Sequence, residues 1–245
     1  RVKINRPLTV VIDAGNGTAS VVAPQLLKDL GCNVIPLFCE LDGRFPNHHP
    51  DPTVVENLVD LQKMVAKHKA DLGIAYDGDA DRIGAIDENG RPIFGDELLV
   101  LYAREILSRK PGAKIISEVK SSHRLYQDIE QHGGKPIMWK TGHSLIKPKM
   151  KEEHAALAGE MSGHMFFADR YYGYDDAIYA SVRLLEILAK QQKPFSSLLA
   201  DLPPSVSTPE IRVDCEDEIK FEVVRHVQKD LSQRFKTNTI DGVRI

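Results

Sequence analysis

The chain has 245 residues, 42% of them hydrophobic and 27% charged, which is ordinary for a globular protein and leaves room for two compact domains. The formal net charge of -3 gives no electrostatic reason to expect nucleic acid or an anionic membrane as a partner. No apolar run approaches the ~20 residues of a membrane-spanning helix, and the odd number of cysteines, without metal-ligand spacing, indicates a reducing, cytoplasmic compartment.

The first part of the chain predicts strands alternating with helices. We expect strands at residues 8–15, 32–38, 72–76 and 82–87, and helices up to about residue 30 and over residues 54–65. This order is typical of a largely parallel sheet with helices on its faces. The Gly-Asn-Gly turn after the first strand fits either a phosphate-binding turn or close helix–strand packing. The loop at residues 41–53, with its adjacent histidines, is interpreted as a rigid loop.

The same alternation follows a boundary near residues 90–96. We expect a helix beginning near Asp96, strands at 114–119 and 135–140, helices over 121–132 and 175–191, and a strand and turn within 154–167. Asp175 is the expected N-cap of the last helix. Residues 202–209 resemble a linker, and residues 210–245 predict a strand, a helix and a final strand. The predicted fold class is α/β, with two consecutive three-layer α/β domains, mostly parallel mixed sheets, and the start of a truncated α+β C-terminal domain.

The most informative segment is the turn between residues 76 and 82, where Asp77, Asp79 and Asp81 occupy alternate positions. Three carboxylates in one turn repel one another unless they converge on a cation, and all-oxygen ligands favour Mg²⁺, Ca²⁺ or Mn²⁺. Arg82 follows directly, and a guanidinium beside a metal site suits a phosphate-bearing ligand. This pattern indicates a phosphoryl-transfer site.

The acidic turn also admits two other interpretations. Counting from Asp77 as an EF-hand loop places Glu88 at the twelfth position, but Arg82 stands where that loop needs glycine, and strands flank it instead of helices. We reject the EF-hand, although Ca²⁺ could bind as a substitute ion. A solvated acidic turn is the simpler alternative, but three evenly spaced aspartates followed by arginine are more organised than ordinary turn chemistry.

Polar side chains in three later loops are further candidates. Lys120 follows a strand, where loops often carry function, although a lone lysine is usually a solvated charge. His143 follows the next strand and, taken alone, is more often structural. Glu160, Ser162 and His164 alternate between two glycines, so in an extended segment they would face one side and suit the vicinal hydroxyls of a sugar. An edge strand with a polar face is the alternative.

Six motifs, in order AGNGTAS, PNHHPDP, AYDGDADR, EVK, WKTGHSLIK and AGEMSGH, together resemble the α-D-phosphohexomutase family, and within it the bacterial phosphomannomutase/phosphoglucomutase branch. The resemblance covers essentially the whole chain, and DGDADR and GEMSGH are its most specific motifs. The methionine at position 161 of the GEMSGH motif resembles that of the mannose/glucose branch, because phosphoglucosamine mutases tend to carry glutamine at this position.

The resemblance implies a protein of four domains around a cleft. Residues 1–92 would be its second domain with the metal loop, 93–203 its third with the sugar loop, and 204–245 the truncated start of its phosphate-binding fourth domain. The resemblance also implies that Mg²⁺ is bound by Asp77, Asp79 and Asp81, and that Arg82 contacts the phosphate. Proton handling and charge stabilisation would fall to Lys120 and His143. The sugar hydroxyls would be bound by Glu160 and Ser162, with His164 nearby.

The implied activity is the interconversion of hexose 1-phosphate and hexose 6-phosphate, of mannose and/or glucose, through a phosphoserine enzyme and a 1,6-bisphosphate. Neither the family's serine loop nor its fourth-domain phosphate loop occurs in the chain. We therefore expect the nucleophile, and N- and C-terminal domains of the same polypeptide, outside these residues, and an isolated chain that folds without turnover. The alternatives are a non-catalytic divalent-cation or sugar-phosphate-binding module, and a phosphatase, whose nucleophile motif is not found.

Overall fold

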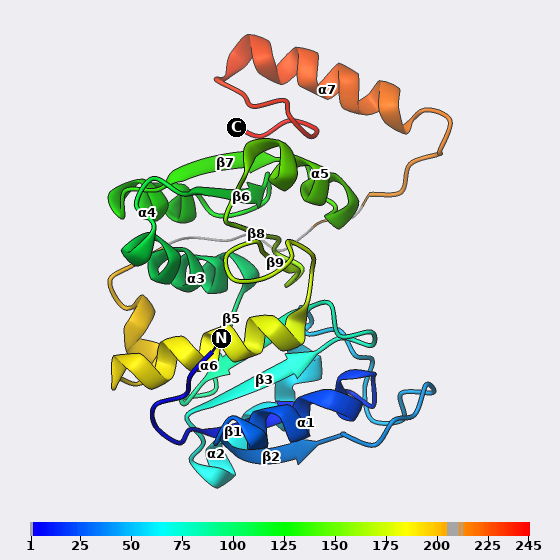
Figure 1. The fold of residues 1–245 in the computed structure, drawn as a ribbon. Coiled ribbons are helices and arrows are strands. Elements are labelled where there is room, and N and C mark those ends of the chain that lie inside the picture. Colours follow the sequence, from blue (N-terminus) through cyan, green and yellow to red (C-terminus); the bar gives the residue numbers. More distant parts are fainter. Residues whose placement is uncertain (1, 205–210, 212) are drawn as a thin grey trace.

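The computed structural model describes residues 2–204, 211 and 213–245, which form two stacked β-sheets with helices between and outside them (Figure 1). The first sheet contains β1 Thr9–Asp13, β2 Asn33–Leu37, β3 Leu72–Tyr76, β4 Ile83–Asp87 and β5 Pro92–Ile93, and the second contains β6 Lys114–Glu118, β7 Lys135–Trp139, β8 Leu157–Gly159 and β9 Met165–Phe167. The α-helices are α1 Ala19–Asp29, α2 Val59–His68, α3 Gly95–Arg109, α4 His123–Gln131, α5 His143–Glu153, α6 Ala177–Gln191 and α7 Lys220–Arg234. Two 3₁₀ helices, η1 Val55–Leu58 and η2 Phe195–Leu199, complete the described elements.

Both sheets are mixed, and the connections explain their pairing. The first has the strand order β2-β1-β3-β4-β5, with β1 parallel to β2 and β3 and the other pairs antiparallel. The second has the order β7-β6-β8-β9, with β6 parallel to β7 and β8 and only β8–β9 antiparallel. Helical crossovers join the parallel neighbours, whereas short turns join the antiparallel ones. The predicted α/β class with two α/β units is confirmed.

A single hydrophobic core links the two sheets. Helix α2 covers the outer face of the first sheet and α5 the outer face of the second, each over a small apolar cluster of its own. Helices α1, α3, α4 and α6 contribute to one continuous cluster between the sheets, and α6 lies against α3 (Figure 1). Two buried tyrosines reach α6: Tyr76 donates to Ser181 Oγ (2.7 Å) and Tyr102 donates to the Ala180 carbonyl (2.9 Å). Helix α6 therefore follows the second sheet in sequence but also packs on the first.

Three local expectations differ from the structure. The helix expected over 54–65 begins as η1 and continues as α2, and α5 had not been expected. The N-cap of α6 is Asp176, whose Oδ1 accepts from Tyr179 N (2.8 Å), and not Asp175. Asp175 is occupied elsewhere, because its Oδ1 accepts from Lys147 Nζ (3.0 Å).

The last part of the chain was expected to read strand, helix, strand. Residues 205–210 and 212 lie outside the described residues, and residues 211 and 213–216 are not in a strand. Helix α7 has no buried residue, and the segment after it contains only an isolated bridge between Asn238 and Arg244. The expected final strand is therefore wrong. Within the described residues, no helix combines the length and the apolar character needed to cross a membrane.

Candidate functional site

The turn between β3 and β4 gathers three carboxylates. One oxygen from each of Asp77, Asp79 and Asp81 lies within 4.8 Å of the others. Ala80 closes the turn in the left-handed region (φ 66°). Carboxylates held this close repel one another, and a hard divalent cation relieves that repulsion while matching their all-oxygen donor set. The residues present therefore fit a site for such an ion.

Asp77 also holds the turn together. It is buried, and its Oδ1 accepts from the backbone amides of Asp81 and Arg82, both at 3.0 Å. Its Oδ2 accepts from Arg82 Nε at 2.7 Å, and Arg82 Nη1 lies 3.5 Å from Asp51 Oδ1. Asp79, by contrast, is exposed. The acidic turn thus contains one carboxylate that fixes its shape and one that is open to solvent.

The Gly-Asn-Gly turn after β1 packs directly against the acidic turn. Thr18 N donates to the Gly78 carbonyl (2.9 Å), and a Cβ placed on Gly17 would lie only 2.7 Å from that same oxygen. The glycine at this position is required by the close approach of two backbones. The close packing at this motif therefore joins two turns, and not a helix and a strand as one of the two interpretations had it.

The loop with adjacent histidines is anchored to β1. His48 Nε2 lies 3.0 Å from Oδ2 of the buried Asp13, whose Oδ1 accepts from Gly15 N (2.8 Å). Among the described residues, neither group of side chains suited to a metal includes His48 or His49. The hydrogen bond to Asp13 raises the pKa of His48 above its ordinary value, although partial burial opposes the rise.

Glu160, Ser162 and His164 lie together in the turn between β8 and β9. His164 Nδ1 is 3.0 Å from Glu160 Oε2 and 2.9 Å from Ser162 Oγ. The expectation of an extended segment is wrong, because Gly163 has a φ of 96° and the chain reverses here. The three side chains meet by curvature of a turn and not by strand alternation. Glu160 is buried, and its Oε1 accepts from Gly142 N (2.7 Å).

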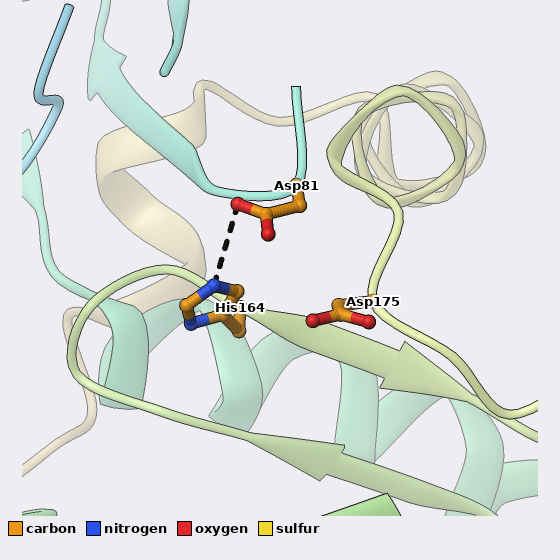
Figure 2. Close-up of side chains that lie close together, drawn as sticks. All are labelled: Asp81, His164 and Asp175. Carbon is orange, nitrogen blue, oxygen red and sulfur yellow. Dashed lines mark ion pairs between the residues drawn. The ribbon is translucent and has the colours of Figure 1, made fainter. Parts of the chain in front are cut away.

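The β3–β4 turn of the first sheet and the β8–β9 turn of the second sheet contact each other. Arg82 and His164 form an antiparallel bridge, and Ile83 N donates to the Gly163 carbonyl (3.1 Å). A side chain at position 163 would collide with the Ile83 carbonyl, so glycine permits this contact. His164 Nε2 lies 3.3 Å from Asp81 Oδ1 (Figure 2). Residues far apart in the sequence therefore form one site.

His143 completes this side of the site at the start of α5. Its ring stacks on that of His164, with centroids 5.5 Å apart and planes 15° from parallel. His143 Nδ1 lies 3.3 Å from Asp175 Oδ2 and 3.2 Å from Lys147 Nζ. Asp175, which sequence reasoning placed only as a cap, faces the site beside His164 and Asp81 (Figure 2).

His164 is surrounded by acidic groups. Its partial burial disfavours the imidazolium, but the hydrogen bond to Glu160 and the charges of Asp81, Glu160 and Asp175 outweigh this effect and raise the pKa of His164. The surroundings therefore favour protonation of this ring more than water does an ordinary histidine. Charge of both signs is concentrated where the two sheets meet.

Lys120 lies in the loop after β6 and is 53% exposed. Its Nζ is 3.6 Å from Oε2 of Glu118, a carboxylate whose side chain is entirely buried. Sequence reasoning missed Glu118, although a glutamate at the end of an apolar strand next to a candidate lysine was an available signal. No described contact joins Lys120 directly to the acidic turn, so the structure links it to the site only through Glu118.

Comparison with known proteins identifies the family of the chain. Residues 2–90 match the phosphoglucomutase/phosphomannomutase alpha/beta/alpha domain II, and residues 94–206 match domain III. The chain belongs to the phosphoglucomutase/phosphomannomutase family. The resemblance predicted from the motifs is confirmed.

Relatives of this family match nearly all of the chain. It is 54% identical over 245 residues to a phosphomannomutase/phosphoglucomutase of Pseudomonas putida, covering 100% of this chain and 53% of that protein. It is 47% identical to a phosphoglucomutase of Neisseria gonorrhoeae, covering 100% of this chain and 54% of that protein. The crystal structure of a family protein from Burkholderia thailandensis superposes with a TM-score of 0.91 at 48% identity, covering 99% of this chain and 52% of that chain. The chain thus spans about half the length of these relatives.

Proposed function

We propose that this chain is the metal- and sugar-binding part of a phosphohexomutase that interconverts hexose 1-phosphate and hexose 6-phosphate of mannose and/or glucose. The reaction would pass through a phosphoserine enzyme and a 1,6-bisphosphate. The observation that carries this proposal is the contact between Asp81 and His164, 3.3 Å apart, which brings a cation-binding turn beside a set of groups able to bind hydroxyls. Phosphoryl transfer to a sugar needs these two functions side by side.

The acidic turn would serve the transferring phosphate. Asp77, Asp79 and Asp81 would hold Mg²⁺, which when bound supplies positive charge against phosphoryl oxygens. Arg82, tied to Asp77 at 2.7 Å, would present its remaining guanidinium donors to the same group. Lys120 and His143 would stabilise charge and handle the proton of the reacting hydroxyl.

The β8–β9 turn would hold the sugar. Glu160 and Ser162 both contact His164, so these three groups offer acceptors and donors on one side. A grip on the 3- and 4-hydroxyls would accept the sugar in either orientation, which a 1,6-bisphosphate intermediate requires. Mannose and glucose differ only at C2, so the same grip would accept both.

The chain would contribute to three domains of the mutase. Residues 1–92 would act as the metal-loop domain, 93–203 as the sugar-loop domain, and 204–245 as the start of a phosphate-binding domain. Asp241 Oδ2 in the last of these accepts from Thr141 N (2.9 Å), which lies beside the site. The partners would be the phosphosugar and the other domains of the same polypeptide, with no role for nucleic acid or membrane. All three cysteines are unpaired, which fits a cytoplasmic location.

The test is a coupled mutase assay on the full-length protein encoded by the whole gene (the gene-length protein), with glucose 1-phosphate and mannose 1-phosphate as substrates. The 245-residue chain and an Asp79→Asn variant of the gene-length protein are the comparisons. Turnover of both sugars that is lost in the variant supports the proposal. No turnover by the gene-length protein would favour a binding module, and calorimetry with Ca²⁺ and Mg²⁺ would then decide, because a sensor-type module binds Ca²⁺ with a Kd on the order of micromolar.

A further inference from the structure

Glu118 is a buried carboxylate to which the proposed function assigns no role. Its side chain is 0% exposed at the carboxyl end of β6. Oε1 accepts from Met161 N and Oε2 accepts from Thr141 Oγ1, both at 2.6 Å. Lys120 Nζ, 3.6 Å from Oε2, provides a charged partner. A carboxylate removed from water is costly unless it is hydrogen-bonded and paired, and both conditions are met here.

The partners of Glu118 come from three separate loops. Lys120 belongs to the loop after β6, Thr141 precedes His143 in the β7–α5 turn, and Met161 stands between Glu160 and Ser162 in the β8–β9 turn. A second bond runs between the same two turns in the opposite sense, from Gly142 N to Glu160 Oε1 (2.7 Å). Two glutamates therefore cross-link the turns that carry the imidazole, the sugar-binding groups and the lysine.

We propose that Glu118 is a positioning residue, which fixes the spacing between Lys120, His143 and the β8–β9 turn without touching the substrate. The inference rests on the proposed function, because it assigns Glu118 to the same site. Short bonds to a charged acceptor in a dry environment are strong and directional, so they limit movement of the backbone at Met161 and of the hydroxyl at Thr141. Catalytic groups need this support, since a displacement of about 1 Å can cost about 100-fold in rate.

Replacements at Glu118 can separate positioning from simple stability. Glu118→Met has similar length but no strong acceptor, so it releases both Met161 N and Thr141. Glu118→Gln keeps an oxygen for Met161 N, and its amide can donate to the Thr141 hydroxyl, so both links survive while the charge facing Lys120 is lost. Thr141→Val removes one link and Thr141→Ser retains it. Glu130→Met, on the exposed side of α4, is the matched control.

The kinetic measurement is made on the gene-length protein with glucose 1-phosphate. We expect Glu118→Met to lower kcat by about 10- to 100-fold with KM changed less than about threefold, because the loss falls on alignment in the transition state. Glu118→Gln should recover most of this loss, Thr141→Val should lose about tenfold, and Thr141→Ser and Glu130→Met should match the wild type. If Glu118→Met does not fold, the Thr141 pair carries the test. Equal kcat in Glu118→Met and Glu130→Met would overturn the proposal.

A second measurement does not depend on catalysis. Hydrogen exchange of the Met161 amide, followed by NMR in the same proteins, should accelerate at least about tenfold in Glu118→Met and remain unchanged in Glu130→Met. Unchanged protection at Met161 would show that Glu118 does not hold the turn, even if kcat falls. If the wild-type protein has no mutase activity, the proposed function fails, and the exchange data alone still support or reject the positioning of the β8–β9 turn.

Discussion

Asp81 and His164 are paired across the two sheets, with Oδ1 and Nε2 3.3 Å apart. The carboxylate comes from the β3–β4 turn and the imidazole from the β8–β9 turn, and backbone bonds between the same turns support the pair. The Asp81–His164 pair would therefore lie between a cation bound at the acidic turn and a sugar bound at the β8–β9 turn. A substitution in one of these turns is expected to affect binding at the other.

Exchange of Gly17 for alanine should disturb the acidic turn from outside it. The new methyl group would lie 2.7 Å from the Gly78 carbonyl, so one backbone must move. We expect the free energy of unfolding to fall by about 1 to 3 kcal/mol and Mg²⁺ binding to weaken. Gly43→Ala is the control, because a Cβ there has no neighbour within 4 Å. Chemical denaturation and Mg²⁺ calorimetry would measure both effects, and equal results for the two variants would contradict the prediction.

Asp79 and Asp77 of the acidic turn should respond differently to replacement by asparagine. Asp79→Asn removes an exposed carboxylate, so it should weaken Mg²⁺-dependent activity of the gene-length protein by at least about tenfold with little change in melting temperature. Asp77→Asn should lower both, since Asp77 accepts three hydrogen bonds within the turn. Asp29→Asn, on the exposed end of α1, is the control. An unchanged Mg²⁺ titration in Asp79→Asn would reject the metal assignment.

Glu160→Ala should reduce the use of both sugars alike. Its carboxylate contacts His164 Nδ1 at 3.0 Å and Gly142 N at 2.7 Å, so its loss removes a hydroxyl acceptor and loosens the β7–α5 turn. We expect kcat/KM to fall by about 10- to 1000-fold for glucose 1-phosphate and for mannose 1-phosphate. Steady-state kinetics with each sugar, and with Glu130→Ala beside it, provide the test. A loss of kcat/KM confined to one sugar would contradict the prediction and would mean that Glu160 distinguishes the two sugars at C2.

The pairing of His48 with Asp13 should make stability depend on pH. The hydrogen bond raises the folded-state pKa of His48, so its stabilisation is complete below the unfolded pKa of about 6.5 and is lost as the pH rises through the folded value. The melting temperatures of the wild type and His48→Gln should therefore differ more near about pH 5.5 than near about pH 8.5. His68→Gln, at an exposed position of α2, should show no such trend. NMR titration of His48 should give a pKa that falls in Asp13→Asn.

Strong local patterns made much of this fold predictable. The strands β3 and β4 are short, mainly apolar runs on either side of a polar turn, so their length and flanks identify them, whereas the apolar stripe of α6 follows from helical periodicity. Helix α5 escaped detection because it buries only Ile146 and Met150 and contains Pro148. With two buried positions, its apolar signal is too weak to recognise.

The site was predictable in part for a different reason. Charged and polar residues in loops stand out in the sequence, which is how the acidic turn, Lys120, His143 and the β8–β9 residues were chosen. Glu118 and Asp175 were not, because their importance comes from contacts with other loops; the place of Glu118 at the end of an apolar strand beside Lys120 was a signal, but it does not encode those contacts. The turn at Gly163 was also taken for an extended segment, since alternation of polar residues does not distinguish a strand from a tight reversal.

The position of α6 has a mechanical consequence. Its first amide, Ala177 N, donates to the Ala80 carbonyl in the acidic turn (3.1 Å), and its buried side joins the core shared by both sheets. A hinge between the two sheets would have to open that core and break this bond. We therefore expect them to move as one rigid body, so opening and closing around a substrate would have to be carried out by other parts of the polypeptide.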